Sequence, residues 1–129
     1  MQDLPPEAIS EALASLLPDE DRSVLADGAF ARDLHDFFAE GVRDGVDGWL
    51  DDDLAFTRPW GFELSEIAVP TSLWQGSVDL MVPLAHGRWI ARAAPGVAAH
   101  LLEGEGHLSI VSHHSGAILD ELLASAGRR

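Results

Sequence analysis

Cysteine is absent from the 129 residues, so disulfides and thiol chemistry are excluded. Long apolar runs are absent as well, and none approaches the ~20 residues that a membrane-spanning helix needs. The first ten residues, MQDLPPEAIS, are acidic and have no apolar core, which is unlike a signal peptide. The missing cysteines do not identify the redox compartment. Without a signal peptide or a membrane span, we expect by default a cytoplasmic protein that does not act in a membrane.

Basic residues are scarce: eight Lys and Arg stand against 22 Asp and Glu, giving a net charge of −14. Such a surface repels nucleic acids and anionic membranes, so we expect neither as a partner. The run Asp51–Asp53 could in principle hold a cation, but adjacent carboxylates on a helix point in different directions. We therefore interpret the acidity as a solvated surface.

The predicted secondary structure changes near the middle of the chain. Apolar residues recur at helical spacing in segments 5–17, 18–27, 28–45 and 46–57, with Gly45 as a stop signal. A loop over 58–70 follows. The remainder alternates a strand over 71–76, a helix over 82–96, a strand over 97–106 and a helix over 108–127. This order predicts an α/β protein, in which a helical segment (1–65) precedes a parallel βαβα unit (66–129).

Two groups of apolar side chains are candidates for the core. The tryptophans each fall in an apolar pattern, so we expect buried positions for Trp49, Trp60, Trp74 and Trp89. The last helix should bury one stripe along its length, formed by Ile110, Ile118, Leu119, Leu122 and Leu123.

Two polar residues follow the predicted strands. Asp79 stands in GSVDLMVP, after the first strand, and His107 stands in EGEGHLS, after the second. In a right-handed βαβ unit both loops leave the same rim of the sheet, where ligands and catalytic groups collect. A carboxylate that accepts from an imidazole N–H fixes the tautomer that a general base requires. Asp79 and His107 are therefore the candidate catalytic residues.

The segment from Val69 to Ile110 resembles the C-terminal end of an α/β-hydrolase. It contains an apolar strand, Gly76-x-x-Asp79, a Val-Pro helix start, a Pro-Gly corner, and a strand that ends in Gly-x-Gly-His107. Residues 1–65 are more weakly similar to the helical cap of such enzymes. The resemblance implies ester or amide hydrolysis by a Ser-His-Asp triad, with Asp79 as the acid and His107 as the base. Trp60 and Phe62, at the exit of the cap, would then contribute to the substrate pocket.

The nucleophile that this family requires is missing from the chain. No serine stands in Gly-x-Ser-x-Gly, and no oxyanion loop precedes the cap-like segment. We therefore expect no esterase activity from this polypeptide alone. Three interpretations remain: a hydrolase fragment, one half of an enzyme completed in trans by an N-terminal half, or a non-catalytic binding or self-associating module.

The resemblance also bears on partners. Only one neighbour of the first strand is encoded, so its other edge, Thr71–Gln75, would be open to pairing, and we expect a homo-oligomer. No cofactor is expected. The histidines do not predict a metal site, because His107 and His114 are ~10 Å apart along a helix and the others show no ligand spacing.

Overall fold

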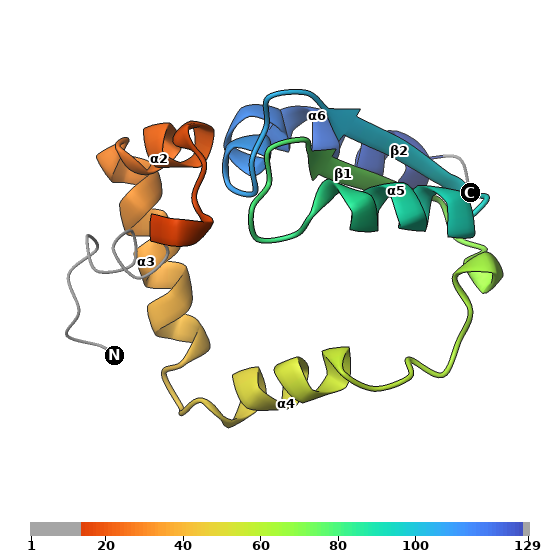
Figure 1. Cartoon of the computed structure of the whole chain (residues 1–129), viewed down its shortest axis with the longest axis horizontal. Helices are drawn as coiled ribbons and strands as arrows, with labels where there is room; N and C mark the ends of the chain where they lie inside the picture. Colours follow the sequence, from red (N-terminus) through yellow and green to blue (C-terminus); the bar gives the residue numbers. More distant parts are fainter. Residues whose placement is uncertain (1–13, 128–129) are drawn as a thin grey trace.

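The computed structural model describes residues 14–127, which form a mixed α/β protein with five α-helices and a small parallel sheet (Figure 1). In chain order the elements are η1 Ala14–Leu16, α2 Asp19–Leu25, α3 Gly28–Gly41, α4 Asp47–Phe56, η2 Leu64–Glu66, β1 Thr71–Gly76, α5 Leu84–Ala93, β2 Val97–Leu102 and α6 Ser109–Ala126. The α/β class is thus confirmed. Most of the helix predicted over 5–17 lies outside the described residues.

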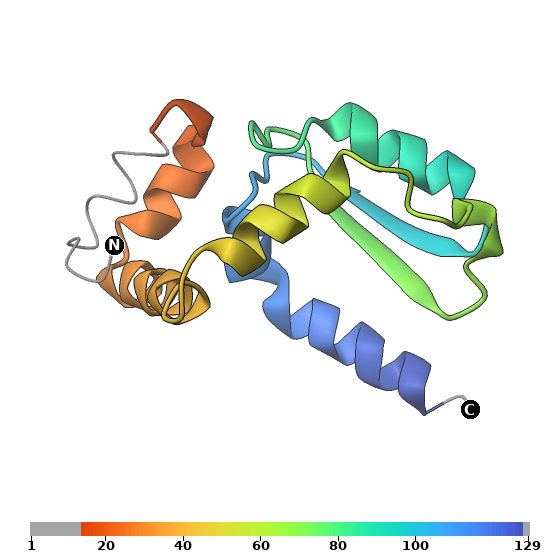
Figure 2. The same ribbon diagram turned by 90° about the horizontal axis from the view of Figure 1, so that it is seen from below.

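The sheet consists of β1 and β2, which are parallel and pair from Thr71 opposite Val97 to Gly76 opposite Leu102. Helix α5 connects the strands and covers one face, and α6 covers the other (Figure 2). Side chains alternate between these faces, as the pleat of a strand requires. Gln75 packs against Gly87 of α5, whereas the ring of Trp74 stacks on His100 and lies beside His114 of α6.

Local sequence explains where the first helices begin and end. Three acids occupy the first turn of α2, where the helix dipole favours them. The side chain of Asp27 caps α3 by accepting from the N–H of Ala29 at 3.0 Å. The stop predicted at Gly45 is wrong, since α3 ends at Gly41. Gly45 lies in the following turn, where it takes a φ of 121° that favours glycine.

The core among the described residues is small. Its buried apolar side chains are Leu17, Val24, Ala94 and Ile110. The expectation that the tryptophans are core residues is wrong for Trp49, Trp60 and Trp89, each about half exposed. It is also wrong for part of the α6 stripe, because Ile110 is buried but Leu119, Leu122 and Leu123 are exposed. Apolar stripes predicted from periodicity therefore face solvent here, because two strands and one crossover helix cannot cover them all.

Helix α2 lies beyond the end of the sheet toward which both strands run (Figure 1). It contacts α3 and the N-terminal part of α6. In Figure 1, helix α4 lies apart from the sheet. Within residues 14–127 no helix combines the length and hydropathy needed to cross a membrane.

Candidate functional site

The loops that follow β1 and β2 are joined by hydrogen bonds that continue the ladder of the sheet. The N–H of Ser77 donates to the carbonyl of Leu102 at 2.8 Å, and the N–H of Val78 donates to the carbonyl of Glu105 at 3.0 Å. The loops also approach so closely at Gly76 that a Cβ there would overlap the Glu105 carbonyl. The two loops are therefore held side by side on one rim of the sheet.

Asp79 is the centre of a network on this rim. Its Oδ1 accepts from the N–H groups of Met81 and Val82, both at 2.8 Å. Its Oδ2 accepts from Nε2 of Gln75 at 3.1 Å and lies 2.9 Å from Nδ1 of His107. Only 5% of the side chain is exposed. A carboxylate with this many donors is fixed in orientation.

The imidazole of His107 has one fixed edge and one open edge. Because Oδ2 of Asp79 can only accept, the neutral ring carries its proton on Nδ1 and presents an unprotonated Nε2. The side chain is 41% exposed. Within the described part of the chain, no hydrogen bond engages Nε2 of His107. Nε2 is therefore the ring nitrogen that can accept a proton.

The structure adds a residue that the sequence did not single out: Asp21, in α2. Its carboxylate is fully buried and accepts three backbone N–H groups, those of His107, Leu108 and Ser109, at 2.8–3.0 Å. These donors lie at the start of α6, where backbone N–H groups have no partner within the helix and a negative charge is also favoured by the helix dipole. Asp21 therefore fixes the backbone of His107 from a distant segment. An acid in the first turn of a short helix usually faces solvent, so no sequence signal marked it.

The backbone next to His107 is also constrained by Gly106 and Ser109. A Cβ on Gly106 would overlap the carboxylate of Asp21, so that carboxylate can approach only a glycine. The N–H of Gly106 donates to Oγ of Ser109, which in turn donates to Oε2 of Glu105 at 2.6 Å. Gly106 is thus needed for the close approach of the Asp21 carboxylate and not for a positive φ, which Gly106 does not adopt.

Glu105 joins this corner to α6. Its carboxylate contacts Nδ1 of His113 at 3.2 Å and Nε2 of His114 at 3.1 Å. Partial burial by itself would raise the pKa of Glu105, but the hydrogen bonds from Ser109, His113 and His114 outweigh it and hold the pKa below its usual value.

Trp60 and Phe62 lie in the loop between α4 and η2. Their rings stack on one another with centroids 6.0 Å apart, and both side chains are about half exposed. Among the described residues, no hydrogen bond or ring contact joins them to Asp79 or His107. Their assignment to a substrate pocket stays a prediction.

The described histidines form no metal site. Across residues 14–127 no group of three or more His, Asp or Glu side chains is arranged to hold a metal ion. His113 and His114 converge on Glu105, and His35 pairs with the neighbouring Asp36.

Comparison of the chain with protein-family models, with curated proteins and with solved structures finds no match. The functional argument therefore depends on the geometry of the rim itself.

Proposed function

We propose that this chain contributes the acid and the base of a Ser-His-Asp triad to an α/β-hydrolase that cleaves an ester or amide bond. The observation that supports the proposal is the 2.9 Å contact between Oδ2 of the buried Asp79 and Nδ1 of His107, on loops that leave adjacent parallel strands. The order of the two residues in the chain, acid before histidine, is that of the α/β-hydrolases.

The proposal gives each residue a role that the geometry supports. Asp79 holds His107 in the Nδ1–H tautomer and stabilises the imidazolium that forms when the ring takes a proton. Nε2 of His107 removes the proton from an attacking hydroxyl and later returns it to the leaving group. Asp21 keeps the histidine backbone in place while this happens.

The attacking hydroxyl must come from a polypeptide segment outside this sequence, since no serine here stands in Gly-x-Ser-x-Gly. An oxyanion hole must come from the same source. We expect the purified chain to hydrolyse p-nitrophenyl acetate no faster than a His107→Ala variant, and to remain unlabelled by a fluorophosphonate probe. Hydrolysis or labelling by the wild-type chain that His107→Ala abolishes would show instead that the site is complete.

The triad assignment is tested by supplying the missing nucleophile. DNA upstream of the coding region is sequenced, and we expect a reading frame that encodes His-Gly and Gly-x-Ser-x-Gly. The upstream polypeptide is then co-expressed with this chain and treated with a fluorophosphonate. Labelling should require this chain, should be lost with His107→Ala, and should survive in the control His86→Ala, which alters an exposed histidine of α5. Absence of such a frame, or labelling that is indifferent to His107, would contradict the proposal.

A second candidate function is a non-catalytic module that associates with itself. It is favoured by the outer edge of β1, Thr71–Gln75, which pairs with no strand among the described residues. An unpaired strand edge offers N–H and C=O groups to another chain, and two copies could align β1 with β1 about a two-fold axis. Light scattering coupled to size exclusion distinguishes the cases: a dimer at micromolar concentration supports edge pairing, and a monomer excludes it.

A further inference from the structure

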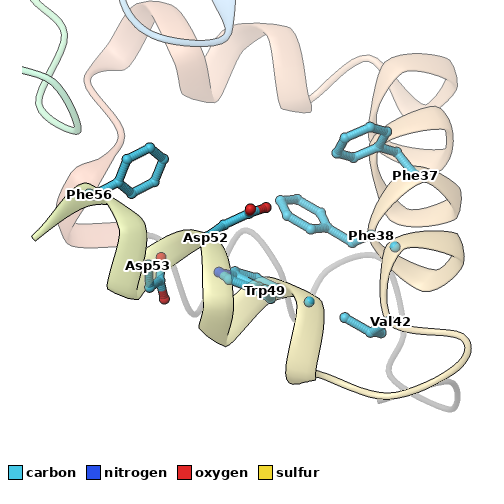
Figure 3. Close-up of a pocket in the computed structure, with 9 residues that line it drawn as sticks. Phe37, Phe38, Val42, Trp49, Asp52, Asp53 and Phe56 are labelled. Carbon is cyan, nitrogen blue, oxygen red and sulfur yellow. The ribbon is translucent and has the colours of Figure 1, made fainter. Parts of the chain in front are cut away.

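A hollow of about 540 Å³ lies between α3 and α4, remote in the sequence from Asp79 and His107 (Figure 3). Its volume is within the range of sites for small organic molecules. The walls are mainly aromatic: Phe37 and Phe38 come from α3, and Trp49 and Phe56 come from α4.

The aromatic rings of the hollow are arranged around an open space and are only partly packed on one another. Phe38 stacks on Trp49 with centroids 5.9 Å apart, and Phe37 meets Phe38 edge to face at 5.7 Å. Phe37 and Phe56 remain more than 70% exposed. Ring faces of this kind are available to a ligand, and their negative potential attracts a cation.

Two carboxylates interrupt this aromatic wall. Asp52 and Asp53 follow Trp49 by three and four residues, and they precede Phe56 by four and three residues. At this spacing all four residues lie on one side of α4. The carboxylate of Asp52 points between Phe56 and Phe38 (Figure 3). Among residues 14–127, no basic side chain forms an ion pair with Asp52 or Asp53. Asp52 and Asp53 both line the hollow, and their side chains leave α4 in different directions, as expected for adjacent residues of a helix (Figure 3).

We propose that the α3–α4 hollow binds an organic cation with an apolar body, such as an aryl-alkyl ammonium. The body would lie against the rings of Phe37, Phe38 and Trp49, and the ammonium would lie beside Asp52 and Asp53. Ring quadrupole and carboxylate both favour a positive charge there. A net charge of −14 concentrates cations near the surface and repels anions, so a carboxylate analogue of the same body should bind more weakly than the ammonium.

The test compares three probes with one phenylbutyl body and different charge: 4-phenylbutylamine, 4-phenylbutanol and 4-phenylbutyrate. Affinities for the full chain are measured by calorimetry at pH 7 and low salt. We expect the amine to bind about tenfold more tightly than the alcohol, and the carboxylate to bind most weakly. A tenfold difference in affinity corresponds to about 1.4 kcal/mol of added attraction. Equal affinity for amine and alcohol would mean that the hollow binds only the apolar body, and it would overturn the proposal.

Variants locate the site. The double variant Asp52→Asn/Asp53→Asn should remove the preference for amine over alcohol, whereas Asp51→Asn, whose side chain does not line the hollow, should keep it. Trp49→Leu should weaken all three probes while far-UV circular dichroism stays unchanged. If Asp51→Asn has the same effect as the double variant, general attraction to the acidic surface explains the binding and the proposed site is wrong. The result does not depend on His107, so failure here leaves the triad proposal untouched.

Discussion

The backbone N–H of His107 donates to Oδ2 of Asp21 at 2.9 Å, although 86 residues separate the two in the sequence. Through this bond and those to Leu108 and Ser109, helix α2 holds the start of α6 in place. The position of the His107 imidazole is thus fixed by two contacts. Asp79 orients the ring, and Asp21 orients the backbone that carries it.

Asp21→Asn should destabilise the protein strongly. Both carboxylate oxygens of Asp21 accept backbone N–H groups, but an asparagine has only one oxygen that can accept. Its NH₂ group would face the remaining N–H donors and could not bind them. Leaving one or two of the three buried N–H groups unpaired should lower the free energy of unfolding by roughly 2–3 kcal/mol. Urea unfolding at pH 7 measures the change.

The control for this variant is Asp19→Asn in the same helix. Asp19 is exposed and forms a surface ion pair with Arg22, so its loss should cost less than about 1 kcal/mol. Equal effects of the two substitutions would mean that the Asp21 bonds do not stabilise the fold.

Asp79→Asn should change the tautomer of His107 as well as stability. Oδ1 of residue 79 must keep facing the N–H groups of Met81 and Val82, so the new NH₂ would face His107. Nδ1 would then have to accept, and the proton of the neutral ring would move to Nε2. Long-range ¹H–¹⁵N NMR reports the tautomer directly.

The wild-type chain should show the Nδ1–H form of His107, and Asp79→Asn should show the Nε2–H form. Signals of His86, which is exposed on α5, should be the same in both proteins. An unchanged His107 tautomer in the variant would show that the Asp79 contact does not determine the state of the ring.

Three glycines should respond to alanine with opposite signs. A Cβ at Gly106 would overlap Asp21, and one at Gly76 would overlap the Glu105 carbonyl, so each substitution should cost about 1–3 kcal/mol or more. Gly116, inside α6, has no neighbour within 4 Å of a new Cβ, and alanine there should stabilise by about 0.5–1 kcal/mol. Thermal unfolding of the three variants provides the comparison, and a stabilising Gly106→Ala would contradict the close approach of Asp21.

Glu105 should contribute to stability in a pH-dependent way. Its folded pKa lies below the usual value of 4.5, so its contribution is fully present above that pH and is lost as the pH falls through the folded pKa. The difference in unfolding free energy between the wild type and Glu105→Gln should therefore be largest near neutral pH and shrink below about pH 4.5. Glu103→Gln, at an exposed position of the same loop, serves as the control. A difference that grows on acidification would mean that the contacts to Ser109, His113 and His114 do not favour the charged form.

Much of the local structure could be predicted from residue patterns. The strand Thr71–Gly76 was predicted with its observed bounds, and α2, α4, α5 and α6 were predicted within a few residues. Short β-rich runs bounded by Gly and Pro, and acids in the first turn of a helix, act over a few residues, so the sequence shows them directly. The approach of Asp79 to His107 followed from one topological rule, because parallel neighbours end on the same rim.

Burial was predicted poorly, and the reason is physical. The stripe that contains Leu119, Leu122 and Leu123 is apolar whether or not anything covers it, and only the neighbouring strands and helices decide its exposure.

What this sequence determined by itself is the class of the fold and the pair Asp79–His107, since both follow from short-range patterns and the handedness of a crossover. Only the tertiary structure decided that Asp21 supports His107 and that Asp52 and Asp53 share a hollow with aromatic rings. A carboxylate has the same chemistry on a surface helix as in a buried one. Its role is decided by which donors, rings or solvent the folded chain places around it, and those neighbours come from distant segments.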